Sequence, residues 1–281
     1  MRKINIEPDK LIEMSDYYNK CKSLAETSLK FNISVRTLKR RLNSAGVNTK
    51  LDVNSLRKKK IIYPIDETYF EEIDTSDKAY ILGLLYSDGW MCTNRKQIRL
   101  KLTDIDLLEK VKEKLNYDKP LTNNTKTKES HKEAKTLIIC NGKIYDDLIK
   151  LGCYTNKTFN CSLPKLNDIF MGDFIRGFFD GDGCIYVGID KRNGNIVGEA
   201  VVISTNNFIN DTIKYLSCYD INASYFRDKN HDNRIGKFRI RQHDSLLKLF
   251  TLMYGNITSD SIYLERKHNK YKEFLKHKKL L

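Results

Sequence analysis

The chain has 281 residues, 40% of them hydrophobic, and a formal net charge of +14, so we expect a globular protein with an anionic partner. Its seven cysteines are scattered and form no C-x-x-C pair, which argues against a zinc finger or a disulfide framework and indicates a reduced, intracellular protein. No signal peptide and no apolar run of membrane-spanning length occurs, so we expect a soluble protein without a membrane partner.

The basic excess is concentrated in residues 1–62, which hold 15 Lys/Arg against six Asp/Glu. Within this region "SLAETSLKFNISVRTLKRRLNSAG" (23–46) predicts two short helices separated at "FNIS", the second capped by Ser34. This pattern favours a small all-α helix-turn-helix module that reads DNA, although a helical hairpin with a solvated basic face remains possible. The run "RKKK" (57–60) is either a linker that touches phosphates or a solvated linker. The predicted DNA contacts of this module are Arg36, Thr37, Arg40 and Arg41.

From residue 63 onward the chain repeats itself. The segment "AYILGLLYSDGW" (79–90) aligns with "DFIRGFFDGDGC" (173–184) at an offset of 94 residues. Each segment is followed by patterns for a hairpin, an amphipathic helix, two further strands and another helix. We therefore predict an α+β fold of two pseudo-symmetric αββαββα halves, residues 63–165 and 166–281.

Both aligned segments place small residues four positions apart, Gly83 with Ser87 and Gly177 with Gly181. Small residues at this spacing clear one face of a helix, so a second helix backbone can approach closely. We therefore expect the two helices to pack side by side at the centre of the molecule.

Each of these helices ends in an acid, Asp88 or Asp182, followed by glycine. Two carboxylates at neighbouring helix C-termini repel each other and the helix dipoles, so their pairing indicates a divalent-metal site. Mg²⁺ is usually held by one or two carboxylates together with phosphate oxygens. The alternative is that glycine and aspartate merely terminate the two helices.

The segments "LGLLYSDG" and "IRGFFDGDG" resemble the two signature motifs of double-motif LAGLIDADG homing endonucleases, over roughly residues 63–278. The resemblance implies a monomer with an internal pseudo-twofold and saddle-shaped sheets that lie in the major groove of double-stranded DNA. It further implies Mg²⁺-dependent cleavage of both strands of a long, asymmetric target with short 3′ overhangs, with roughly two or three ions shared between Asp88, Asp182 and DNA phosphates. Tyr86 stands where the second motif has Asp180, so Asp180 is expected to be dispensable.

The resemblance also implies a basic residue near the scissile phosphates in each half. The matching positions are Lys157 and Lys267, with Arg266 beside the latter, and Asp104 and Thr205 match a polar site that holds water or metal. A lysine at such a place can offset charge that develops on the phosphate.

Basic residues on the strand-like stretches are candidates for DNA contact, because a two-stranded ribbon fits the major groove. Any half-buried antiparallel sheet is polar on one face, so each residue alone is equally explained by solvation. The candidates are Arg99, Lys101, Lys126, Lys128, Arg227, Lys237, Arg239 and Arg241.

The sequence thus favours a site-specific DNA endonuclease with an appended helix-turn-helix. The rival is a nucleic-acid-binding protein on the same fold that no longer cuts, such as an intron maturase or a transcription regulator. Because non-cutting relatives often lose one of the two acids, the presence of both Asp88 and Asp182 favours cleavage.

Overall fold

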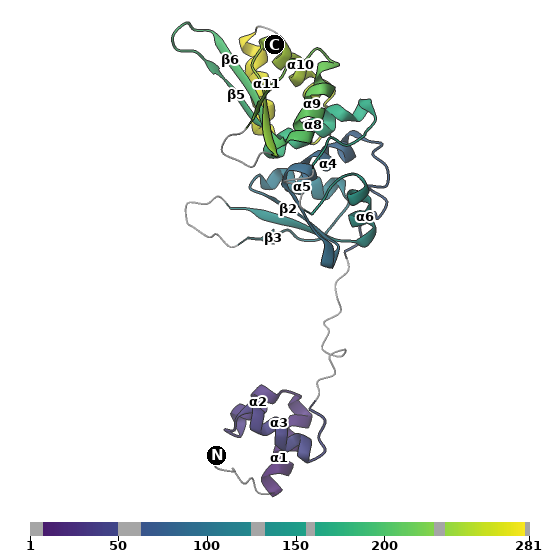
Figure 1. The fold of residues 1–281 in the computed structure, drawn as a ribbon. Helices are drawn as coiled ribbons and strands as arrows, with labels where there is room; N and C mark the ends of the chain where they lie inside the picture. Colours follow the sequence, from purple (N-terminus) through teal and green to yellow (C-terminus); the bar gives the residue numbers. More distant parts are fainter. Residues whose placement is uncertain (1–7, 50–62, 125–132, 156–160, 228–233, 279–281) are drawn as a thin grey trace. The chain divides into compact units, whose positions relative to one another are not determined.

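In a computed structural model the chain divides into two compact units, Met1–Ile62 and Tyr63–Leu281 (Figure 1). Within the parts of the chain that the structure describes, no helix is long and apolar enough to cross a membrane. The described residues are 8–49, 63–124, 133–155, 161–227 and 234–278.

Residues 8–49 of the N-terminal unit form a bundle of three helices, α1 (Pro8–Cys21), α2 (Leu24–Lys30) and α3 (Val35–Ser44). The two expected helices correspond to α2 and α3, and the Ser34 side chain accepts a hydrogen bond from the backbone N–H of Thr37 at 3.2 Å at the start of α3. Helix α1 adds a third side to the core. That core consists of Met14, Tyr18, Leu38 and Leu42, all at most 2% exposed.

The larger unit contains two four-stranded antiparallel sheets with the same strand order, β1-β2-β4-β3 and β5-β6-β8-β7. This result confirms the predicted α+β class with two sheets of matching topology. The strands of the first sheet are β1 (Gly89–Cys92), β2 (Gln97–Leu102), β3 (Thr122–Asn123) and β4 (Lys135–Cys140). Those of the second are β5 (Cys184–Ile189), β6 (Ile196–Thr205), β7 (Ser224–Arg227) and β8 (Ile235–Ile240).

Each sheet is accompanied by three helices in the order expected from the repeat. They are α4 (Ser76–Asp88), α5 (Ile105–Lys114) and α6 (Gly142–Lys150) in the first half, and α8 (Asp168–Asp182), α9 (Asn206–Ser217) and α10 (His243–Tyr254) in the second. A last helix, α11 (Glu265–His277), packs on β5 and β6 through the buried Phe274. The division between the halves at residues 165/166 stays a prediction.

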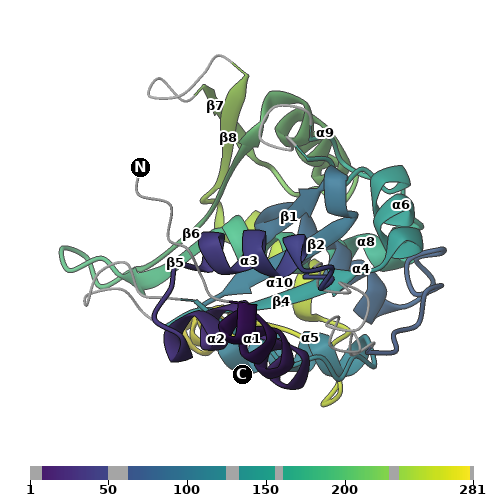
Figure 2. The same ribbon diagram turned by 90° about the horizontal axis from the view of Figure 1, so that it is seen from below.

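Helices α4 and α8 lie side by side at the junction of the two halves (Figures 1 and 2). Both are almost wholly buried, because large side chains on them pack under the sheets while small ones face the partner helix. One core therefore runs through both halves, from Ile98 and Leu100 of β2 to Phe238 and Ile240 of β8.

Candidate active site

The two central helices touch at their glycines. A Cβ built on Gly83 would overlap the carbonyl oxygen of Phe174 and lie 2.8 Å from the backbone nitrogen of Phe178. A Cβ on Gly177 would likewise overlap the carbonyl oxygen of Tyr80. The neighbouring atoms are backbone and cannot swing aside, so these two positions accept only glycine in this packing.

The same approach continues at the C-terminal ends of α4 and α8, where Gly181 lies against Ser87 and Asp88. A Cβ on Gly181 would overlap both the Ser87 hydroxyl oxygen and Oδ2 of Asp88. The Asp88 carboxylate is therefore beside the residue that precedes Asp182. Asp88 is half-buried and Asp182 is exposed. The structure thus brings the two predicted metal-binding acids to the same end of the helix pair.

Two carboxylates at one end of a helix pair suit a hard divalent cation that shares its coordination with phosphate oxygens. A cation held by protein ligands alone would need a larger donor set. Within the described ranges, no group of three or more His, Cys, Asp and Glu side chains could hold a metal ion. Asp88 and Asp182 therefore fit a divalent cation that takes its remaining ligands from a bound molecule.

Lys267 is only 5% exposed and lies at the C-terminal end of α8. Its Nζ donates hydrogen bonds to the carbonyl oxygens of Phe179 and Asp180, the latter at 2.9 Å. Burial lowers the pKa of Lys267 to about 8, although the carboxylates of Asp180 and Asp88 oppose this shift. The Phe179 carbonyl also accepts the backbone N–H of Gly183 at 3.0 Å, so Lys267 adds a second donor to it and offsets the negative end of the helix dipole. Lys157, the predicted counterpart, lies outside the described residues.

Asp180 is 3% exposed, and its Oδ2 accepts hydrogen bonds from the Tyr80 hydroxyl at 2.7 Å and the Leu264 backbone N–H at 2.8 Å. Burial raises its pKa to about 6, against the opposing effects of these donors and of the nearby charges on Lys267 and Arg176. Asp180 therefore ties α8 to α4 and to the chain entering α11. The motif spacing did not reveal this role, because Tyr86 stands at the corresponding position.

Tyr86 makes a different connection. Its buried hydroxyl donates a hydrogen bond to the carbonyl oxygen of Leu151 at 2.5 Å, just after α6. The next residue, Gly152, has φ +95°, and a Cβ there would overlap the Tyr86 hydroxyl. The tyrosine in place of an acid therefore anchors the end of α6 in the first half.

The two predicted polar positions differ in their surroundings. Asp104 pairs with Arg266 at 3.3 Å, and both border a cleft of about 580 Å³ between the start of α5 and the start of α11. Thr205 is buried, donates a hydrogen bond to the Cys161 carbonyl and accepts one from the Phe208 N–H at 3.2 Å. The Thr205 hydroxyl therefore acts as both a donor and an acceptor in bonds that stabilise the fold.

Strand pairing shows on which face of its sheet each predicted DNA-contacting residue lies. In the first sheet Arg99 and Lys101 alternate with buried Ile98 and Leu100, so they share the face away from the core. The outer face of the second sheet carries Lys237 and Arg239, and Arg241 follows one residue after β8 in the same alternation. Arg227 pairs with Gly236, so it occupies the opposite face from Lys237. Lys126 and Lys128 lie outside the described residues, as does the "RKKK" segment (57–60).

In the N-terminal unit, Arg36 and Arg40 are exposed on α3, four residues apart and therefore on one helix face. Thr37 is half-buried and its Oγ1 accepts a hydrogen bond from the Ser34 hydroxyl at 2.8 Å. Arg41 is also half-buried. Of the four predicted DNA contacts on α3, only Arg36 and Arg40 are thus exposed.

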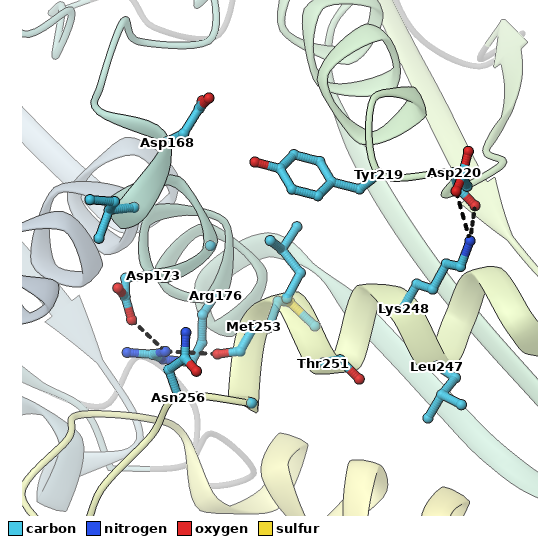
Figure 3. Close-up of a pocket in the computed structure, with 14 residues that line it drawn as sticks. Asp168, Asp173, Arg176, Tyr219, Asp220, Leu247, Lys248, Thr251, Met253 and Asn256 are labelled. Carbon is cyan, nitrogen blue, oxygen red and sulfur yellow. Dashed lines mark hydrogen bonds and ion pairs between the residues drawn. The ribbon is translucent and has the colours of Figure 1, made fainter.

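A separate pocket of about 770 Å³ lies at the N-terminal end of α8, between the end of α9 and helix α10 (Figure 3). Arg176 pairs there with Asp173 at 2.7 Å, and Lys248 pairs with Asp220 at 3.2 Å. The pocket is lined by α8 residues from Asp168 to Arg176, so along the helix axis it ends about 9 Å before Asp182 at 1.5 Å per residue. Neither Asp88 nor Asp182 lines it.

Part of the chain is similar to known proteins. Residues 170–253 match the family model of the LAGLIDADG-like domain. No curated protein matches the sequence. Among solved structures, the I-LtrWI LAGLIDADG homing endonuclease bound to target DNA is 13% identical with a TM-score of 0.49, covering 76% of this chain and 92% of that chain. The LAGLIDADG homing endonuclease I-GzeII in complex with its DNA target is 14% identical with a TM-score of 0.43, covering 72% of this chain and 88% of that chain. Full-length DUF199/WhiA from Thermatoga maritima is 15% identical with a TM-score of 0.46, covering 75% of this chain and 66% of that chain. The family-model match therefore runs from α8 to α10, within the second of the two repeated halves.

Proposed function

We propose that this protein is a site-specific DNA endonuclease of the homing type, which cuts both strands of a long, asymmetric target and leaves short 3′ overhangs. The observation that carries the proposal is that Asp88 lies beside Gly181, the residue before Asp182, at one end of a tightly packed helix pair. A fold that needs only helix termination has no use for two acids brought together from segments 94 residues apart.

Asp88 and Asp182 would hold Mg²⁺ together with the phosphate oxygens of the DNA. When bound, such an ion activates a water molecule and stabilises the departing oxygen in phosphodiester hydrolysis. Lys267 holds the last turn of α8 in place and so positions Asp182. Lys157 remains a proposed contact to the scissile phosphate.

The outer faces of both sheets would lie in the major groove, with Arg99 and Lys101 on one and Lys237 and Arg239 on the other. The net charge of +14 supports binding to the phosphate backbone. Because one chain carries both halves and both acids, a monomer suffices for two cuts. The helix-turn-helix unit would extend contact on one flank of the target.

The proposal is tested by incubating the full chain with a randomised duplex library, with Mg²⁺ or with EDTA, and sequencing the ends produced. We expect defined double-strand ends with short 3′ overhangs in Mg²⁺ and none in EDTA. Sequence-selective binding without metal-dependent ends would contradict the nuclease and support the second candidate below.

That second candidate is a non-cleaving nucleic-acid-binding protein on the same fold, acting as an intron maturase or a transcription regulator. One observation favours it: Lys267, the expected catalytic lysine of the second half, is committed to backbone carbonyls of α8. If Lys267 stays bonded to these carbonyls when DNA binds, it does not reach the scissile phosphate of the second half.

A further inference from the structure

The outer face of the first sheet carries the sole tryptophan of the sequence, Trp90, with 47% of its surface exposed. Strand pairing sets Trp90 directly opposite Arg99, and the Arg99 guanidinium lies 4.8 Å from the centre of the indole ring. A cation at this distance over an indole face is attracted to it electrostatically. The tryptophan is therefore a platform that holds the arginine against the sheet.

A second contact fixes the rotation of the same guanidinium. Arg99 Nε donates a hydrogen bond to Gln97 Oε1 at 2.7 Å. The Gln97 side chain is itself held, because Nε2 donates to Cys140 Sγ at 3.1 Å and the residue is only 9% exposed. Arg99 is thus restrained from two directions before any ligand arrives.

These contacts leave the far end of the guanidinium unused. Within the part of the chain that the structure describes, neither Nη1 nor Nη2 of Arg99 makes a hydrogen bond or an ion pair. A planar fork of N–H donors on a sheet face that fits the major groove matches guanine, which presents N7 and O6 side by side as acceptors. No other base presents two adjacent acceptors in that groove.

The corresponding arginine of the second sheet has a different environment. Arg239 also lies over a ring, 4.5 Å from the centre of Phe226, but its Nε is 3.3 Å from Glu199 Oε1. The carboxylate offsets the charge of Arg239 and competes for its donors. The two sheets therefore differ in the arginine that they offer to a DNA target, since among the described residues Arg239 is paired with a carboxylate and Arg99 is not.

We propose that Arg99 is a specificity-determining residue that reads one guanine in the major groove, and that Trp90 and Gln97 are positioning residues for it. This inference rests on the proposed function only in requiring that the first sheet bind duplex DNA, not that the protein cut it. Holding the fork in its binding geometry removes ordering cost on association, so the preference is expected to be strong.

The test is a selection of bound duplexes from a randomised library in EDTA, followed by sequencing, for the full chain and three variants. The wild type should show a guanine preference at one position that Arg99→Ala lowers roughly 5- to 150-fold, leaving the other positions unchanged. Arg99→Lys should lose the same preference while keeping most of the overall affinity, because it retains the charge without the planar fork. Lys101→Ala, on the same strand, should weaken binding to all sequences alike and lower the salt dependence.

Loss of affinity in Arg99→Ala that is uniform across sequences, or an unchanged guanine preference, would overturn the inference and assign Arg99 to phosphate contact or to no contact. A protein that binds no duplex at any salt concentration would instead refute the proposed function. The two failures are distinguishable because duplex binding by the wild type and its weakening in Lys101→Ala are still measured when only the Arg99 inference fails.

The positioning role of Trp90 has its own readout. Trp90→Ala should reduce the guanine preference, and Trp90→Phe should restore most of it, since a phenyl ring still offers a face for stacking. Because Trp90 is the sole tryptophan, its fluorescence should also change on addition of duplex DNA. An equal guanine preference in Trp90→Ala and wild type would contradict a positioning role for Trp90. Tryptophan fluorescence that does not change at saturating DNA would contradict it as well.

Discussion

The Tyr80 hydroxyl of α4 donates a 2.7 Å hydrogen bond to Oδ2 of Asp180 in α8, a residue 100 positions later in the chain. Tyr80 is fully buried and Asp180 is 3% exposed. The bond joins the two helices next to a glycine contact, since the Tyr80 carbonyl is the atom that Gly177 approaches. Its geometry therefore bears on both the stability of the interface and the position of Asp182, two residues further on.

Tyr80→Phe should lower the free energy of unfolding by about 1–3 kcal/mol, because it removes a donor from a buried carboxylate without creating a cavity. Denaturant unfolding measures the change. Tyr145→Phe is the matched control, since that buried tyrosine makes only a 3.3 Å bond to Thr93. Equal effects of the two variants would contradict a special role for the Tyr80 bond.

Asp180 should make stability depend on pH. Its folded-state pKa of about 6 lies above its ordinary value of 3.8, so between these values the folded protein holds a proton that the unfolded chain releases. This contribution is fully present below about pH 4 and is lost as the pH rises through 6. The free energy of unfolding of wild type minus that of Asp180→Asn should therefore fall by about 3 kcal/mol from pH 4 to pH 7. A difference that stays constant over this range would show that the carboxyl is ionised throughout.

Gly83→Ala and Gly177→Ala should each lower the free energy of unfolding by about 3 kcal/mol or more, because the new methyl group meets backbone that cannot move aside. Gly142→Ala is the control within a helix. A Cβ there would lie 3.5 Å from the flexible Lys96 side chain, and stability should rise by about 0.4–1 kcal/mol. Thermal melts of the three variants would decide, and a tolerated Gly83→Ala would refute the close approach.

Asp88→Asn and Asp182→Asn should each reduce Mg²⁺-dependent cleavage of a selected target on the order of 10²- to 10³-fold while leaving unfolding nearly unchanged. Binding should hold or strengthen, since each variant removes a negative charge near phosphate. Asp190→Asn serves as control because Asp190 lies in the β5–β6 turn and pairs with Arg192. Cleavage that survives both acid variants would exclude the acid pair as the active site.

Deletion of residues 1–62 should weaken DNA binding and shorten the protected footprint on one flank only. The larger unit keeps its own core, so it is expected to fold without this region. The slope of log affinity against log salt concentration should become less steep, because fewer phosphates are neutralised. Footprinting and salt titration measure both effects. A footprint of unchanged length would refute a role for the N-terminal unit in DNA contact.

Features that depend on local periodicity were accessible from the amino-acid sequence. The spacing of Gly83, Ser87, Gly177 and Gly181 determines which side of each helix is small, since helix geometry repeats every 3.6 residues. The same geometry places Asp88 and Asp182 at helix ends. Alternation along β2 likewise assigns Arg99 and Lys101 to one face of the sheet.

Features that depend on partners far away in the chain were decided only by the tertiary structure. Lys267 meets carbonyls 87 and 88 residues earlier, Asp180 meets Tyr80, and Tyr86 meets Leu151. Residue type and spacing alone place Arg227 with the other basic strand residues, but the pairing of β7 with β8 puts it on the opposite face from Lys237. Such contacts follow from how strands and helices dock, and hydrogen bonds are sensitive to distance and angle in a way that residue spacing does not encode. The sequence by itself determined the repeat, the helix contact and the acid pair, whereas the buried roles of Asp180, Tyr86 and Lys267 came from packing between distant segments.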